Sequence, residues 1–377
     1  MKDCFVIMPI GSGEIYNIYR NRFDEIIKPA VEGIKSNGNQ AFKCIRADFV
    51  SKTGSITRDV IARLYRADAV IADLTDLNPN VFYELGVRHS LRSGTLLVGI
   101  EGTKPPFDIG DLRIIYYEDR VGAQKVAIPK IQEFLKPLLD DNKSIDSPVL
   151  LAIPSLLENK ASLELEAKVD SLEQETKILK AQLEISEKSN LANQSSLESL
   201  RKAIESLIAH LSETEKQKAE ETIKSASKTN QTEWPTPMMK QLSDIPVDMN
   251  SIFVLMPFSK DLEPVYQVIQ SAAQMEGLHC FRADELFSAG TIMDQIFDSI
   301  RKAGLIVADL SGRNQNVMYE LGVANAMGKN TLLLAQALEE VPFDLRHIRV
   351  IEYNLSFGSV DVLRNKLQIA FKQYKDS

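Results

Sequence analysis

The stretch AVIADLTDLNPNVFYELGVRHSLRSG, residues 69–94, has a counterpart later in the chain, LIVADLSGRNQNVMYELGVANAMGK, residues 305–329. Tyr83-Glu84-Leu85-Gly86 matches Tyr319-Glu320-Leu321-Gly322, which sets an offset of 236 (319 − 83). The same offset carries Arg46-Ala47-Asp48 onto Arg282-Ala283-Asp284, and Pro106-Phe107-Asp108 onto Pro342-Phe343-Asp344. A register shared by three separate motifs predicts one domain present in two copies.

Each copy is predicted to be built around a strand, a turn and a helix that carries a glutamate. Residues 69–72 are a short apolar run typical of a buried strand in a parallel sheet. Asp73 follows at the carboxyl end of this strand, where open α/β sheets place their ligands. Asn78 and Pro79 are a favourable N-cap and first residue of a helix. Glu84 then falls in the second turn, where the helix dipole favours its ionised form.

An ionised glutamate at the rim of a sheet can act as a nucleophile or as a base. The structural alternative is that Glu84 pairs with a nearby cation or caps a backbone group. Because the second copy repeats it as Glu320 together with its polar neighbours, both interpretations stay open. The residues predicted to bind a substrate in these stretches are Asp73, Asn78, Asn80, Tyr83, Asp309, Asn314, Asn316 and Tyr319.

The composition limits the class of protein. A length of 377 residues allows two or three domains, and 44% hydrophobic with 25% charged residues is ordinary for a globular protein. The net charge of −8 and the lack of a dense Lys/Arg cluster argue against a long nucleic acid as partner. A small anionic ligand remains possible, because backbone N–H groups can bind one locally.

Cysteine and histidine usage adds further expectations. Three cysteines do not make a disulfide framework, and with no signal peptide visible we expect a cytoplasmic protein. No apolar run approaches the length of a membrane span. Four scattered histidines predict no metal site, and no cofactor is predicted.

Strands alternating with helices predict an α/β fold with a mostly parallel sheet covered on both faces, of the flavodoxin-like kind. The copies are assigned to residues 1–145 and 251–377. The predicted strands are residues 5–9, 42–45, 69–72, 95–100 and 113–117 in the first copy, and 252–256, 280–281, 305–308, 331–334 and 349–353 in the second. The predicted helices are residues 19–31, 56–67, 79–93 and 127–139, then 262–275, 292–301, the helix of Glu320 and 360–374.

Two further places in the first copy are candidates for substrate binding. The turn Gly11-Ser12-Gly13 follows the first strand, where such folds hold phosphate or ribose, although a simple structural turn explains it equally well. The second copy has Phe258-Ser259-Lys260 there instead. Asp48 and Asp284 follow the second strands and could contact ribose hydroxyls or form turns.

Residues 154–227 have a different composition, rich in Leu, Glu, Lys, Ser and Ala without glycine. Leucines at heptad spacing, among them Leu172 and Leu179, predict a helical segment that acts as a spacer or assembly element. A continuous coiled coil would join two chains into a homodimer or higher oligomer, whereas a break near residues 189–196 would give a helical hairpin. Residues 228–250 are expected to be an irregular linker.

At the run from Asp73 to Gly86 the sequence resembles the nucleoside 2-deoxyribosyltransferase superfamily. Related members include deoxynucleoside monophosphate N-glycosidases and TIR-like domains of bacterial antiviral systems. The resemblance covers both end domains and rests on residues 59–86 and 294–322. It implies that Glu84, and Glu320 in the second copy, attack the anomeric carbon of a ribosyl or deoxyribosyl group. It further implies that Asp59, on the preceding helix, acts as an acid or orienting group.

The second copy departs from this pattern, because the partner of Asp59 at offset 236 is Gln295, with Asp294 one position early. If only one copy is catalytic, we expect it to be the first. The leading hypothesis is therefore an enzyme, a hydrolase or transferase, acting on the N-glycosidic bond of a nucleoside, nucleotide or NAD-type substrate. A role in antiviral defence is implied by the resemblance alone. The alternative is a nucleotide-sensing or scaffolding protein with catalytically degenerate domains.

Overall fold

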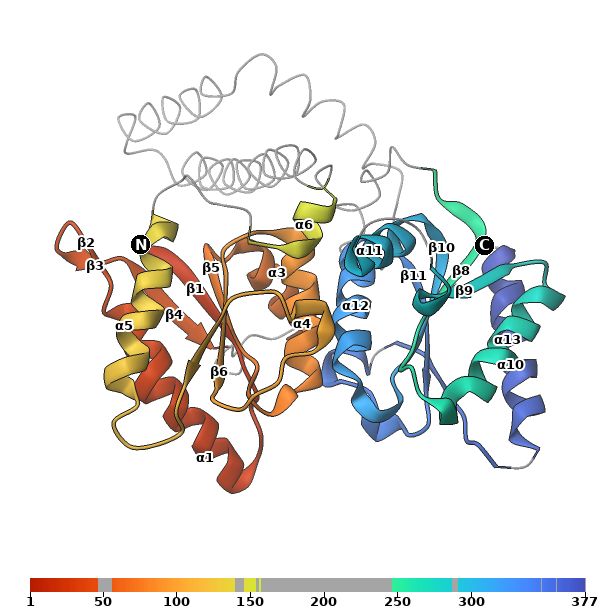
Figure 1. The fold of residues 1–377 in the computed structure, drawn as a ribbon, viewed down its shortest axis with the longest axis horizontal. Coiled ribbons are helices and arrows are strands. Elements are labelled where there is room, and N and C mark those ends of the chain that lie inside the picture. The colour runs from red at the N-terminus through yellow and green to blue at the C-terminus, as the bar shows by residue number, and fades with distance from the viewer. Residues whose placement is uncertain are drawn as a thin grey trace, which may run out of the picture. The chain divides into compact units, whose positions relative to one another are not determined.

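The computed structural model describes residues 1–46, 56–139, 146–153, 156, 246–286, 291–346, 348–356 and 358–376. Met1–Pro154 and Leu242–Ser377 form one compact unit, which contains both copies (Figure 1). The predicted helical segment of residues 154–227 and the linker of residues 228–250 lie outside the described residues, except for Leu156 and residues 246–250.

The first copy contains a five-stranded sheet in the order β4-β1-β5-β6-β7. Every pairing between neighbouring strands is parallel. The central strand is buried at all its positions, as expected for a parallel sheet covered on both faces. These findings confirm the predicted α/β class. The strands are β1 (Lys2–Ile7), β4 (Phe42–Arg46), β5 (Ala69–Asp73), β6 (Thr95–Ile100) and β7 (Ile114–Tyr117).

Helices cover both faces of this sheet. One face packs against a helical segment that follows β1 and against the closing helix, and together they bury an apolar core. This segment consists of α1 (Gly13–Arg22), the π-helix η1 (Phe23–Ile27) and α2 (Lys28–Glu32), and the closing helix is α5 (Gln124–Leu135). On the other face lie α3 (Ile56–Arg66) and α4 (Pro79–Leu91), and α4 also contacts the short α6 (Pro148–Ala152).

The second copy repeats this arrangement. Its sheet has the order β12-β11-β10-β8-β9, which is the same topology read from the other edge, and all its pairings are parallel. Helices α10 and α13 share a core on one face, and α11 and α12 lie on the other. The elements are β8 (Asp248–Leu255), α10 (Glu263–Met275), β9 (His279–Arg282), α11 (Ile292–Lys302), β10 (Ala303–Asp309), α12 (Gln315–Ala326), β11 (Asn330–Ala335), β12 (Val350–Glu352) and α13 (Ser359–Lys375).

The structure differs from the sequence-based expectations in a few places. The first helix begins at Gly13 rather than at Tyr19, and β8 begins at Asp248 rather than at Ile252. A two-stranded hairpin, β2 (Lys35–Ser36) and β3 (Asn39–Gln40), is present in the first copy and has no equivalent in the described part of the second. Its turn places Asn37 and Gly38 at φ values of 50° and 81°, the left-handed backbone for which an Asn-Gly pair is suited.

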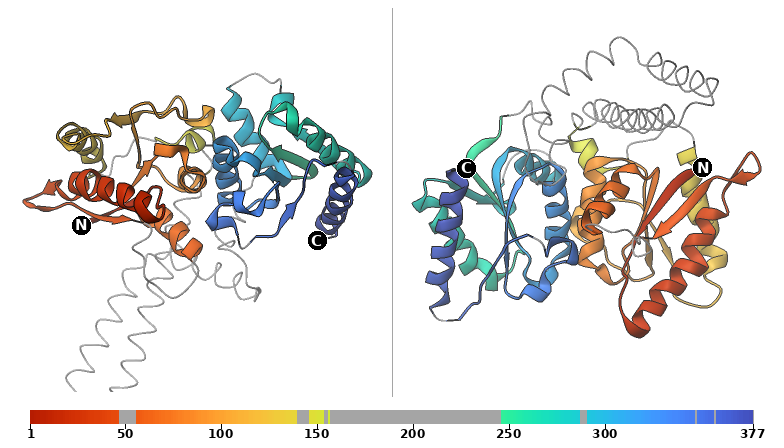
Figure 2. Two further views of the ribbon diagram at one scale, coloured as in Figure 1. Left: turned by 90° about the horizontal axis from the view of Figure 1, so that it is seen from below. Right: turned by 180° about the vertical axis from the view of Figure 1, so that it is seen from behind.

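The largest described contact between the two copies is made by one helix from each. Among the described elements, helices α4 and α12 make the most extensive contact, and they lie side by side between the two sheets in all three views (Figures 1 and 2). These are the helices that carry Glu84 and Glu320. Among the described residues, no helix is both long enough and apolar enough to cross a bilayer.

Candidate functional site

The turn between the central strand and the glutamate helix has the same unusual backbone in both copies. In the first copy, Asp76 and Leu77 in η3 (Thr75–Leu77) have φ values of 62° and 49°. In the second copy, Gly312 and Arg313 have φ values of 71° and 53° in η9 (Ser311–Arg313). Residues other than glycine rarely adopt this left-handed backbone conformation. It persists only where surrounding contacts stabilise it.

The asparagine after this turn caps the glutamate helix, as the sequence predicts. The Asn78 side chain accepts a hydrogen bond of 3.0 Å from the Asn80 backbone N–H, and Pro79 is the first residue of α4. Asn314 accepts equivalent bonds from the N–H groups of Asn316 and Val317. The predicted N-cap Asn78 is therefore confirmed, and the structure shows that Asn314 caps the equivalent helix. A contact of these side chains with a substrate stays a prediction.

The aspartate that ends the central strand is fully buried in both copies, and its oxygens are held by protein groups. Asp73 accepts bonds from the Arg22 guanidinium at 3.1 Å and from the Thr75 N–H at 3.0 Å. Tyr19, on the same helix as Arg22, donates to Asp76 at 2.8 Å. Helix α1 thus anchors the left-handed turn of the first copy.

The second copy anchors its turn from the opposite side. Asp309 accepts a 2.6 Å bond from the Tyr353 hydroxyl, which follows β12, and a 3.0 Å bond from the Ser311 N–H. Glu340 accepts a bond from the Gly312 N–H. The two aspartates therefore support the turns through different partners, and their predicted role in substrate binding stays a prediction.

Helices α4 and α12 cross at two glycines. A Cβ atom added at Gly86 would lie 2.1 Å from the backbone oxygen of Tyr319, and one added at Gly322 would lie 2.2 Å from that of Tyr83. Each glycine therefore lets the other helix approach to backbone contact. Since equivalent residues exchange roles, the contact has the reciprocal pattern of a twofold dimer interface.

The tyrosine before each glutamate is bonded to the other copy. The Asn325 amide donates to the Tyr83 hydroxyl at 3.1 Å, and Nδ1 of His89 lies 2.9 Å from the Tyr319 hydroxyl. Asn325 is the partner of His89 at offset 236, so the two bonds are equivalent. Burial, and then the charge of Arg88, lower the pKa of His89 to about 3, which keeps its ring neutral.

Each glutamate lies next to an aspartate of the other copy. Glu84, 8% exposed, shares a side-chain hydrogen bond with Asp344 in η11 (Phe343–Leu345). Glu320, 7% exposed, lies within the electrostatic influence of Asp108 in η4 (Phe107–Ile109). Asp108 and Asp344 are themselves 5% exposed. The structure therefore forms two buried carboxyl pairs, and each pair takes one member from each copy.

Burial governs the protonation of these pairs. Burial, followed by the neighbouring Asp344, raises the pKa of Glu84 well above its usual range. Burial and the charge of Asp108 do the same to the pKa of Glu320. Burial alone raises the pKa of Asp108 to about 7. Two adjacent carboxyl groups in a site of low polarity cannot both ionise without a large cost, so each pair retains a proton near neutral pH.

We expect Asp108→Asn to gain stability relative to the wild-type chain as the pH rises from 5 to 8, by roughly 3 kcal/mol. Folded Asp108 keeps its proton up to about pH 7, whereas the unfolded chain loses it near its usual value of 3.8. Raising the pH therefore weakens the wild-type fold, and asparagine cannot ionise. Because the pKa of His89 is lowered to about 3, this residue makes the fold less stable as the pH falls. It does so equally in the wild-type chain and in Asp108→Asn. Guanidinium denaturation at several pH values measures the difference.

The exposed Asp111 provides the control for this prediction. Asp111→Asn should follow the wild-type chain at every pH, because a substitution at an exposed position removes no buried contact. A stability difference between Asp108→Asn and the wild-type chain that does not change with pH would contradict the protonated state inferred for Asp108.

Two hydrogen bonds between a side chain of α12 and a backbone group of the first copy also join the copies. The Asp108 N–H donates to the Asn316 side chain at 3.3 Å, and the Gln315 amide donates to the Leu77 carbonyl at 3.3 Å. Asn316 therefore holds the loop that carries Asp108 beside Glu320. It contributes to the arrangement of the carboxyl pair through this bond.

The other residues proposed from sequence lie elsewhere. Gly11, Ser12 and Gly13 are exposed, with φ values of 67° and 60° at the two glycines, and Ser12 is the N-cap residue of α1 without a side-chain capping bond. Asp48 lies outside the described residues. Asp284 is 43% exposed and accepts two bonds of 2.7 Å from Arg282.

Asp59 lies on α3 and lines a cavity whose described lining does not include Glu84. In the second copy, Asp294 is exposed, and its backbone N–H bonds to the hydroxyl of Thr291. The pairing of Glu84 with Asp59 therefore stays a prediction, whereas its hydrogen bond with Asp344 is present. Within the described ranges, no cluster of three or more side chains suited to a metal ion occurs.

The sequence carries one signal for the aspartate partners of the glutamates. Pro-Phe-Asp occurs at both positions 106–108 and 342–344, in the register of the glutamate motif. Repetition alone marks Asp108 and Asp344 as candidates, but it does not reveal that their side chains serve the opposite copy. Comparison of the whole sequence with protein-family models gives no match, and comparison with curated proteins gives none either.

Proposed function

We propose that the chain breaks or transfers the N-glycosidic bond of a nucleoside, nucleotide or NAD-type substrate, with Glu84 as the nucleophile. The observation that carries the proposal is the buried hydrogen-bonded pair of Glu84 and Asp344. The resemblance of residues 59–86 to nucleoside 2-deoxyribosyltransferases and related N-glycosidases supports it. So does the strand order, which numbered within each copy reads 2-1-3-4-5 and is the flavodoxin-like order.

A pair of carboxyl groups that shares one proton fits this chemistry. The reaction uses the form of the pair in which the shared proton lies on Asp344. As the bond from C1′ to the base nitrogen breaks, the carboxylate of Glu84 forms a bond to C1′ and Asp344 donates its proton to the departing base. Water then attacks C1′, its proton returns to Asp344, and the C1′–Glu84 bond breaks to release the sugar. If a second base attacks instead of water, the same steps give transfer. The pair also stabilises the positive charge that develops on the sugar.

The first copy is the proposed site of turnover, because Glu84 is hydrogen-bonded to Asp344, whereas Asp108 acts on Glu320 through its charge. The first copy also keeps the pattern of the resemblance at Asp59, where the second copy has Gln295. In this proposal the second copy supplies Asp344 and is required even if Glu320 is inactive. Residues 154–227 are proposed to join two chains into a homodimer or higher oligomer, and a role in antiviral defence rests on the resemblance.

Base release from purified protein tests the proposal. We expect incubation with NAD and a panel of nucleosides and deoxynucleotides to release free base from at least one substrate. Glu84→Gln should lower this rate by about a thousandfold or more, because the amide cannot form the glycosyl ester. Glu320→Gln is the matched control, being buried alike on the equivalent helix, and it should retain most of the activity.

A second function, nucleotide sensing, has one specific observation in its favour. The raised pKa of Glu84 keeps much of the pair uncharged, which suits a group that donates a hydrogen bond to a ligand. The same panel separates the two functions. A substrate that is retained stoichiometrically, without release of base from the wild-type chain, would replace the enzyme with the sensor.

A further inference from the structure

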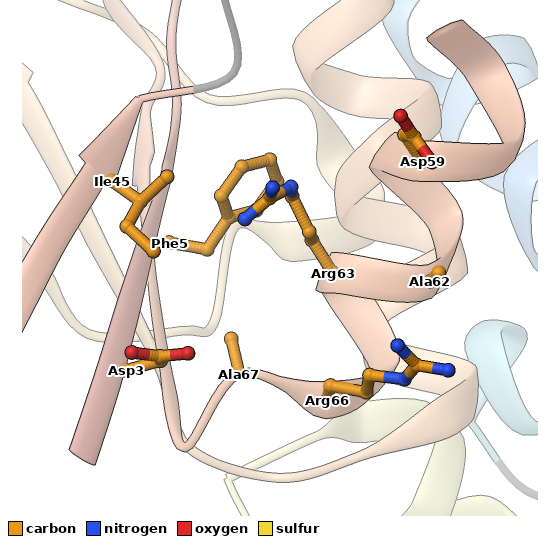
Figure 3. Close-up of a pocket in the computed structure, with 8 residues that line it drawn as sticks. All are labelled: Asp3, Phe5, Ile45, Asp59, Ala62, Arg63, Arg66 and Ala67. Carbon is orange, nitrogen blue, oxygen red and sulfur yellow. The ribbon is translucent and has the colours of Figure 1, made fainter. Parts of the chain in front are cut away.

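A cavity of about 200 Å³ lies in the first copy between α3 and the sheet. Phe5 and Ile45, neighbours on the paired strands β1 and β4, contribute apolar side chains. Figure 3 shows Asp59 and Arg63 on α3, with Arg63 extending towards the two strands. The lining residues are Asp3, Phe5, Ile45, Asp59, Ala62, Arg63, Arg66 and Ala67.

Two charged side chains that line this cavity, Asp59 and Arg63, have no hydrogen-bond or ion-pair partner among the described residues. Asp59 and Arg63 are four residues apart on α3 and both are half-buried. This spacing permits an ion pair on a helix, yet within the described part of the chain neither side chain forms a hydrogen bond or an ion pair. A half-buried guanidinium without a partner keeps its capacity to bind a carboxylate through two hydrogen bonds.

The equivalent place in the second copy has different side chains. There Phe281 replaces Ile45, and its ring packs on Phe253 with ring centroids 5.1 Å apart. Ser299 replaces Arg63 and is buried. Phe253 itself is equivalent to Phe5, since each pairs with the central strand at the same register. The second copy thus keeps the phenylalanine of the first strand but differs at Ile45, Asp59 and Arg63, where it has Phe281, Gln295 and Ser299.

We propose that this cavity binds a free α-amino acid with an apolar side chain. Arg63 receives the carboxylate, Asp59 receives the ammonium group one helical turn away, and the side chain lies against Phe5 and Ile45. A ligand with one charge of each sign matches a lining that contains two aspartates and two arginines. A simple anion would leave the aspartates opposed to it. Glu84 and Asp344, which carry the proposed glycosidic reaction, do not line the cavity, so binding here can be measured separately from turnover.

Ligand-detected NMR with the full chain tests this site. The probes are L-leucine, L-valine, L-methionine and L-phenylalanine, with 4-methylpentanoate and isopentylamine as leucine analogues that each lack one charge. We expect at least one amino acid to bind, and each analogue to bind at least tenfold more weakly. Arg63→Ser and Ile45→Phe, which introduce the residues of the second copy, should each weaken amino-acid binding at least tenfold.

Two further variants complete the design. Phe281→Ile is the matched control, because it alters the equivalent position where no arginine is present, and it should leave binding unchanged. Glu84→Gln should also bind normally, which separates this site from the proposed turnover. Circular dichroism confirms that Arg63→Ser and Ile45→Phe are folded. The proposal is overturned if none of the four amino acids binds at 10 mM, roughly the weakest affinity worth assigning to a site. It is also overturned if binding survives both Arg63→Ser and Ile45→Phe. A third contradicting result would be that 4-methylpentanoate binds as well as leucine.

Discussion

Asp344→Asn should lower the rate of base release by about a hundredfold or more, the usual contribution of a positioned acid. Asp344 belongs to the second copy, yet its carboxyl group bonds to Glu84 of the first. Asparagine keeps the size of the side chain and removes the proton that the departing base needs. In the wild-type chain we expect the rate to fall at alkaline pH, as the proton donor loses its proton. Asp344→Asn should remove this fall in rate. Measurements of kcat/KM against pH read out both effects.

Asp59→Asn is the decisive comparison, because the family resemblance assigns the second carboxyl role to Asp59. We expect it to leave most of the activity, and the exposed Asp111→Asn to leave all of it. If Asp59→Asn instead abolishes turnover while Asp344→Asn retains it, the proton donor is Asp59. The hydrogen bond between Glu84 and Asp344 would then serve only to join the copies.

Gly86→Ala should destabilise the chain by about 3 kcal/mol, near the upper range for a misfitting methyl group. The new Cβ atom would lie 2.1 Å from the Tyr319 carbonyl oxygen and 3.1 Å from the Val323 nitrogen. Both are backbone atoms, which cannot rotate away, so the two helices must move apart. Since Asp344 moves with the second copy, base release should fall as well. Guanidinium denaturation and the turnover assay measure the two effects.

Gly99→Ala provides the control, because Gly99 is also buried but the nearest atom to an added Cβ, in Thr103, is 3.6 Å away. It should change stability by much less than Gly86→Ala. Equal effects of the two substitutions would show that the crossing at Gly86 tolerates a methyl group, and the close approach of α4 and α12 would then need revision.

The sequence was sufficient to predict the duplication, the α/β class and most strands, because these depend on local patterns. The apolar run before Asp73 is a buried strand, and Asn78 caps a helix that begins at Pro79. Both features follow from residues adjacent in the chain. The first helix was predicted to start too late, because its early residues, among them the exposed Ile15 and Ile18, do not show the spacing of a buried face.

The composition of the candidate site could not be predicted in the same way. The Glu84–Asp344 pair depends on how α4 packs against α12. Apolar spacing can show which face of a helix is buried, but it does not show which helix covers that face. The anchors of the two aspartates, Arg22 for Asp73 and Tyr353 for Asp309, also come from different parts of each copy. No spacing rule relates an aspartate at the end of one strand to a partner that differs between the copies.

The crossed carboxyl pairs have a genetic consequence. Under the proposed reaction, the substitutions that abolish turnover do not fall in one half of the gene. Glu84 is encoded in the first half and its partner Asp344 in the second. Defects in both residues should cost little more than a defect in one, because both belong to the same site. The first half therefore cannot be inherited as a working enzyme without the second.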